Sequence, residues 1–231
     1  MSFKNASKTL IYISIAWLLY SAAIYFLKLK AHGTLEIEVN LIETAVGFIS
    51  AILLFAYFYK SKQFLSLGIG LAILSWTLGE IFWFSYEMIK GDMLPYPSVG
   101  EFGFLGTYFF IAGSIGNIKS NNKHRIAIIA LAFLIMLIPV MLLFKSSNTL
   151  GAVVYNFIFI SAIAFVLYKA LSKYKSSLKY LFIGILLFCT TDITFIIEAN
   201  VRDYTIICDM LYPLCFSILT YGAMKEGAEN G

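Results

Sequence analysis

The sequence predicts an all-α, polytopic membrane protein with about eight transmembrane helices. Hydrophobic residues make up 60% of the 231 residues, and only 13% are charged, against roughly 25% in soluble domains. Apolar segments of about 20 residues, the length that crosses a bilayer as a helix, occupy most of the chain. They are continuous rather than alternating, which excludes β-barrel spans. We therefore expect a single integral membrane domain over residues 1–231, without a soluble catalytic or effector domain.

Eight apolar segments are candidate spans. In chain order they are Leu10–Leu27, Leu41–Tyr59, Phe64–Ile89, Val99–Ile118, Ile126–Phe144, Thr149–Leu171, Leu178–Glu198 and Tyr204–Met224. If these spans alternate in direction, twelve of the 17 Lys and Arg fall on the side that holds both termini. The positive-inside rule assigns that side to the cytoplasm. We predict a multi-pass protein of the cell membrane with cytoplasmic N- and C-termini, and we expect the lipid bilayer, but no nucleic acid, as a partner.

The acidic residues are distributed unusually for a membrane protein. On this topology, eleven of the 13 carboxylates lie at mid-membrane or toward the outer face, and no Lys or Arg lies well inside a span. A charged Asp at a helix centre costs about 2.5–3.5 kcal/mol, so such a group must be protonated, hydrated or bound to a ligand. Helix capping is the expected role of Glu43 and Asp203, whereas Glu101, in a Ser98-x-x-Glu101 capping box, fits a cap and a site equally well. Five acids have no local explanation: Glu80, Glu87, Asp192, Glu198 and Asp209.

The third and fourth spans resemble the seventh and eighth. Each pair contains an acid, an aromatic residue three positions later, a second acid and then a tyrosine. In order, these are Glu80, Trp83, Glu101 and Tyr108 in one pair, and Asp192, Phe195, Asp209 and Tyr212 in the other. The match predicts two four-helix halves, residues 1–118 and 119–231, related as a parallel repeat.

Such a repeat would bring acids from both halves around one cavity, which we expect to open to the outer face. Aromatic side chains beside carboxylates suit an apolar or cationic ligand. The predicted ligand-binding residues are Glu80, Trp83, Glu87, Glu101, Tyr108, Asp192, Asp209 and Tyr212.

The thiols and imidazoles do not indicate a metal site. Cys189, Cys208 and Cys215 lie inside apolar spans, where burial as small hydrophobic side chains is expected. His32 and His124 lie in loops, and the spacing of zinc ligands is missing from the sequence. We expect neither a metal nor a cofactor.

One stretch of the chain matches a known pattern. It reads Gly79-Glu80-Ile81-Phe82-Trp83, then Glu87, then Pro95-Tyr96-Pro97-Ser98-x-x-Glu101, then Tyr108. Together with Asp192 and Asp209-x-x-Tyr212, it resembles the polytopic input regions that precede some bacterial diguanylate cyclases. Glu stands here at both places where that family has Asp, and the chain contains no cyclase. The resemblance implies a sensory or ligand-binding protein for an unidentified amphiphilic or cationic small ligand, acting through a separate signalling partner protein.

Two alternatives remain open. Gly79-Glu80 and Thr191-Asp192 more loosely resemble the Gly-Asp and Ser-Asp of YhhN-type lysoplasmalogenases. That resemblance implies a lipid hydrolase with Glu80 and Asp192 as catalytic residues, one protonating the vinyl ether and the other activating water. Acids without basic partners inside the membrane also suit a proton- or cation-coupled carrier.

Overall fold

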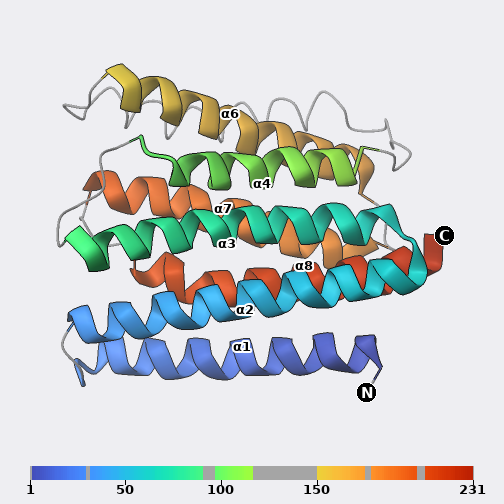
Figure 1. Cartoon of the computed structure of the whole chain (residues 1–231), viewed down its shortest axis with the longest axis horizontal. Coiled ribbons are helices and arrows are strands. Elements are labelled where there is room, and N and C mark those ends of the chain that lie inside the picture. The colour runs from blue at the N-terminus through green and yellow to red at the C-terminus, as the bar shows by residue number, and fades with distance from the viewer. Residues whose placement is uncertain are drawn as a thin grey trace.

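The computed structural model describes residues 2–29, 32–90, 97–116, 150–174, 178–201 and 206–230, which form a bundle of seven roughly parallel and antiparallel helices (Figure 1). In chain order, the helices are α1 (Phe3–Phe26), α2 (His32–Ser61), α3 (Phe64–Lys90), α4 (Gly100–Ser114), α6 (Leu150–Lys173), α7 (Lys179–Val201) and α8 (Ile206–Asn230). The predicted all-α class is confirmed for these residues.

Six of the seven helices are long and apolar enough to cross a membrane, and these are α1, α2, α3, α6, α7 and α8. Helix α4 has 15 residues, about 22 Å at 1.5 Å per residue, which is shorter than the roughly 30 Å hydrocarbon core. The expected span Ile126–Phe144 lies outside the described residues. Eight spans in two halves therefore remain a prediction, whereas six apolar helices indicate a multi-pass membrane protein.

Helix α8 is the centre of the bundle. It packs against α1, α2, α3 and α7, and it is the most buried of the six membrane-length helices. Hydroxyl groups bind it to α1, because Ser14 Oγ lies 2.7 Å from Ser217 Oγ and donates to the Pro213 carbonyl at 3.1 Å. Small hydroxylated residues are typical of such contacts between membrane helices.

Glycines allow α3 and α4 to approach each other closely. A Cβ atom built on Gly103 would lie 2.6 Å from the Ser75 carbonyl oxygen and 2.9 Å from the Gly79 backbone. A Cβ on Gly79 would lie 2.8 Å from the Gly100 carbonyl oxygen. Because only hydrogen fits at these positions, the sequence fixes which faces of the two helices meet. A second close contact joins α7 and α8, where a Cβ on Gly222 would lie 2.4 Å from the Leu181 nitrogen.

Basic residues gather at one end of the bundle. The two ends of the described chain lie at the same end in Figure 1, together with the last turns of α2 and α6 and the first turn of α7. The lysines of these helix ends and their flanks are Lys4, Lys8, Lys60, Lys62, Lys169, Lys173, Lys179 and Lys225. The structure thus brings together eight of the twelve basic residues that the sequence assigns to the cytoplasmic side.

Candidate functional site: a carboxyl cluster

Asp192, on the inward face of α7, joins three helices. It accepts a hydrogen bond from the Tyr108 hydroxyl of α4 at one oxygen, and from the Tyr212 hydroxyl of α8 at the other. All three residues are buried, with 1–3% of each exposed. The repeat pattern predicted both tyrosines as site residues together with Asp192, and the structure places the three in direct contact.

Aromatic rings surround this contact. The Trp76 ring lies 4.4 Å from the Tyr212 ring and 5.1 Å from the Phe216 ring, measured between centroids. Phe188 lies 5.8 Å from both tyrosine rings. Aromatic rings therefore enclose the contact between Asp192 and the two phenol groups. Trp76 and Phe188 were not among the predicted site residues, because an aromatic side chain in an apolar span carries no signal of its own.

Glu43 is not a helix cap. Helix α2 begins at His32, so Glu43 lies in the fourth turn of that helix, and the expected cap formed by Asn40 and Glu43 is wrong. The prediction rested on a local Asn-x-x-Glu spacing, which does not show whether the helix has already begun. Glu43 is fully buried, and within the described part of the chain neither of its carboxyl oxygens has a hydrogen-bond partner. One turn away, Asn40 is 9% exposed, and its side-chain oxygen is also unpartnered there.

Four carboxyl groups from four helices form one electrostatic neighbourhood. Glu43 of α2 interacts most strongly with Glu80 of α3, then with Asp209 of α8, and more weakly with Asp192 of α7. Tyr212 interacts with Asp192, Glu43 and Asp209. Helical spacing explains the arrangement: Trp76 and Glu80 are four residues apart on α3, and Asp209 and Tyr212 are three apart on α8, so each pair shares a face. We call Glu43, Glu80, Asp192 and Asp209 the carboxyl cluster.

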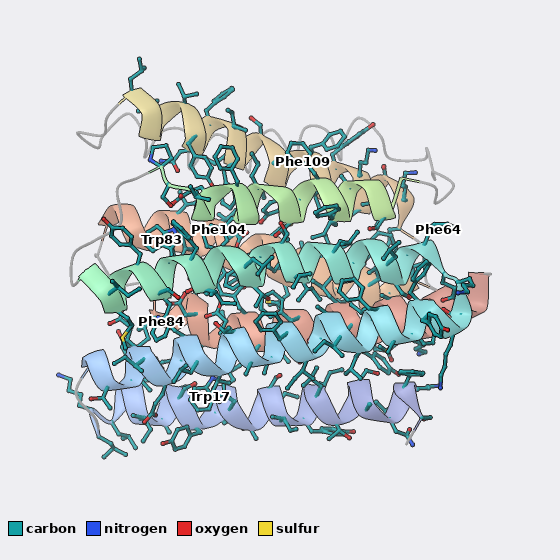
Figure 2. All side chains as sticks on the ribbon, in the orientation of Figure 1. Trp17, Phe64, Trp83, Phe84, Phe104 and Phe109 are labelled. Atoms are coloured by element: carbon teal, nitrogen blue, oxygen red, sulfur yellow. The ribbon has the colours of Figure 1, made fainter. Side chains whose placement is uncertain are left out.

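Glu101 belongs to a separate contact at the start of α4. Its Oε1 accepts a hydrogen bond from Trp83 Nε1 at 3.1 Å, and its Oε2 accepts from the backbone nitrogen and the hydroxyl of Ser98. Figure 2 shows Trp83 between α3 and α4. Glu101 thus reaches back to the Ser98 nitrogen as a capping box requires, but the N-cap residue is Val99, which has no side-chain capping bond, so the predicted box is confirmed only in part. Glu101 also connects the two helices. Its contact with a ligand stays a prediction.

Replacing Glu101 by alanine is expected to lower the free energy of unfolding by about 2 kcal/mol, because it removes the acceptor of the Ser98 nitrogen and leaves the half-buried Trp83 indole N–H unpaired. Glu101→Gln should lose about half as much, since its amide oxygen still accepts one of these bonds. Unfolding of the purified protein by sodium dodecyl sulfate in mixed micelles measures both values. Equal stability of the wild type and Glu101→Ala would contradict the assignment.

Three of the acidic residues singled out in the sequence lie outside what the structure describes. They are Glu87 and Glu198, whose side chains are not described, and the predicted cap Asp203. Cys189, Cys208 and Cys215 are buried free thiols, as expected. Among the described residues, no group of three or more His, Cys, Asp or Glu side chains is placed to hold a metal ion.

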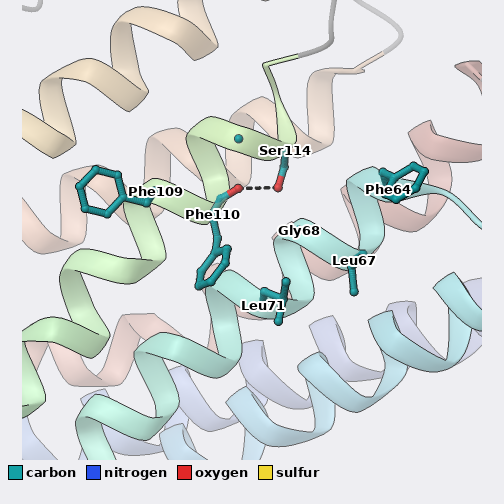
Figure 3. Close-up of a pocket in the computed structure, with 8 residues that line it drawn as sticks. Phe64, Leu67, Gly68, Leu71, Phe109, Phe110 and Ser114 are labelled. Atoms are coloured by element: carbon teal, nitrogen blue, oxygen red, sulfur yellow. Dashed lines mark hydrogen bonds between the residues drawn. The ribbon is translucent and has the colours of Figure 1, made fainter.

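A shallow groove lies on the surface between α3 and α4, away from the carboxyl cluster (Figure 3). It has a volume of about 280 Å³ and is lined mainly by apolar residues, including Phe64, Leu71 and Phe110. None of the predicted site residues lines it. Phe64 and Phe109, at its rim, are largely exposed, as side chains on the lipid-facing surface of a membrane protein would be.

Six apolar helices define the class, which is a multi-pass helical membrane protein, and the buried Glu43 and Asp192 are ionisable groups in its interior. Comparison with known proteins adds no closer assignment, because no protein-family model, no curated protein and no solved structure matches the chain. The function therefore has to be argued from the carboxyl cluster itself.

Proposed function

We propose that this chain is a sensory or ligand-binding protein of the cell membrane whose carboxyl cluster binds a small organic cation. The observation that carries the proposal is the electrostatic interaction of carboxyl groups from α2, α3, α7 and α8, of which Glu43 and Asp192 are buried and Glu80 and Asp209 are half-buried. Buried negative charge requires compensation, and a bound cation supplies it.

The surroundings of the cluster favour an organic cation of ammonium type over a metal ion. Ca²⁺ takes six to eight oxygen ligands, and Mg²⁺ requires a near-octahedral set, whereas the described residues contain no metal-binding group. Tyr212 donates to Asp192 and interacts electrostatically with Glu43, and the Trp76 ring lies 4.4 Å from the Tyr212 ring. The π-electrons of such rings attract an ammonium group. Carboxylate and aromatic groups together are the usual chemistry for recognising quaternary ammonium ligands.

The rest of the proposal follows the sequence. Eight spans in two halves, cytoplasmic termini and a cavity opening to the outer face form the scaffold of a receptor, which would signal through a separate protein. The resemblance of Gly79–Tyr108 to the input regions of diguanylate cyclases supports this role, as does the location of both described chain ends at the lysine-rich end.

A cation-coupled carrier is the second candidate, because an unpartnered carboxyl group such as Glu43 is also what a transport pathway needs. The hydrolase alternative gains no support of its own. Both oxygens of Asp192 already accept phenol hydrogen bonds, and the residue is buried among aromatic rings.

The test is binding of choline, compared with its uncharged isostere 3,3-dimethylbutan-1-ol, to purified protein in an uncharged detergent. At a concentration a hundred times its Kd, choline should stabilise the fold by about 2.7 kcal/mol, which corresponds to a rise in Tm of about 5–10 °C. The alcohol has the same shape without the charge and should produce no rise.

The variants Glu43→Gln and Asp192→Asn should each weaken choline binding at least tenfold. Glu36→Gln is the matched control, because Glu36 is exposed on the same helix two turns from Glu43, and it should bind choline as the wild type does. Equal stabilisation by choline and the alcohol would refute the proposal, as would unchanged binding in both cluster variants. Uptake of labelled choline into proteoliposomes would instead favour the second candidate function, the cation-coupled carrier.

A further inference from the structure

Two members of the carboxyl cluster differ sharply in their hydrogen bonds. Asp192 receives two phenol hydrogens, one at each oxygen, which is the arrangement that stabilises an ionised carboxylate. Glu43 receives none within the described residues, although it is fully buried. The protein thus provides for a negative charge on Asp192 but not on Glu43.

The groups that act electrostatically on Glu43 increase this difference. They are Glu80 from α3, Asp209, Tyr212 and Cys215 from α8, and Asp192 from α7, which is bound in turn by Tyr108 of α4. Among the described residues, α1 contributes none of these electrostatic neighbours, and none of them is a Lys or Arg. Since the acids repel a further negative charge, the cluster favours a proton on the carboxyl group that has no donors.

We infer that Glu43 is a proton-binding site that is protonated when the cluster is empty, and that an arriving organic cation takes the place of the proton. In the exchange, the O–H bond of Glu43 breaks, its proton passes to water, and the carboxylate left behind faces the positive charge of the ligand. Charge is conserved, because one positive charge leaves the cluster as one enters. The exchange step rests on the proposed function, whereas the protonation of Glu43 does not.

This exchange makes cation binding depend on pH. Because each binding event releases a proton, the affinity for choline should rise about tenfold per pH unit while Glu43 is protonated in the free protein. In Glu43→Gln, residue 43 has no ionisable proton to release, so the residual affinity should depend less on pH than that of the wild type.

The first experiment needs no ligand. The infrared spectrum of the protein in nanodiscs should contain a carbonyl-stretch band of a protonated carboxylic acid, which shifts in deuterated water and is missing from Glu43→Gln but retained in Glu36→Gln. If Glu43→Gln does not fold, the intensity of the carbonyl-stretch band of the wild type is measured as a function of pH instead, and loss of the band at high pH is expected. Absence of the band near neutral pH, or its persistence in a folded Glu43→Gln variant, would overturn the inference.

The second experiment measures proton release in weakly buffered solution as choline is added, together with the Kd for choline between pH 5 and 8. One proton released per choline and a tenfold change in Kd per pH unit are expected. Binding without proton release, at constant Kd, would overturn the exchange and leave the proposed function standing. A protonated Glu43 in a protein that binds no choline would confirm the proton site and refute the proposed function.

Discussion

Gly103→Ala is expected to lower the free energy of unfolding by about 2–3 kcal/mol, the upper range for overpacking a core. The added methyl group would lie 2.6 Å from the Ser75 carbonyl oxygen and 2.9 Å from the Gly79 backbone. Both are backbone atoms of α3, which no rotamer change can move away. The strain can be relieved only by separating α3 from α4, which would also draw Tyr108 of α4 away from Asp192.

Gly113→Ala is the matched control, since it lies on the same helix and a Cβ atom there meets nothing within 4 Å. That variant should be as stable as the wild type or more stable by up to about 1 kcal/mol, because alanine favours helix more than glycine does. Titration with sodium dodecyl sulfate in mixed micelles compares the two variants directly. If Gly103→Ala were as stable as Gly113→Ala, the close contact between α3 and α4 would be refuted.

Asp192→Ala should have the larger effect, a loss of about 2–6 kcal/mol, because it leaves the hydroxyls of Tyr108 and Tyr212 buried without their acceptor, at about 1–3 kcal/mol each. Asp192→Asn keeps one acceptor oxygen and should lose about half as much. Since the two tyrosines come from different helices, α4 and α8, the loss should be accompanied by weaker packing of both helices against α7.

A double-mutant cycle isolates the hydrogen bond from the general cost of changing the core. Tyr108→Phe is destabilising in the wild type, because Asp192 loses a donor, but in Asp192→Ala it removes an unpaired hydroxyl and should restore about 1–3 kcal/mol. Additive effects of the two substitutions would show that the hydroxyl of Tyr108 and Asp192 do not interact.

Hydropathy predicted the long helices well where the apolar segment and the helix coincide. The expected Phe64–Ile89 and the observed α3 differ by a single residue. The prediction for the second span started nine residues late, because Glu36 and Glu38 lower the hydropathy of the first turns of α2 without ending the helix. The fourth span was predicted too long, since hydropathy does not detect that α4 ends at Ser114 in a contact with α3.

The candidate site was predictable only where the sequence carries an internal comparison. Matching the two pairs of spans selected Asp192, Tyr108 and Tyr212, three residues distant in the chain that form one contact. Glu43 has no counterpart in that match, and a local spacing led to the wrong prediction that it caps a helix. Its burial depends on how α2 meets α3 and α8, which is a property of the assembled bundle and not of any short segment.

The central position of α8 also constrains biogenesis. The ribosome makes α2 long before α8, so Glu43 enters the bilayer when the helix that will shield it, together with Asp209 and Tyr212, has not yet been synthesised. The nascent chain must therefore tolerate an acidic side chain facing lipid or the translocon until α8 inserts. A chain truncated before residue 206 would keep that polar surface exposed, and membrane quality-control proteases would have a clear signal by which to recognise it.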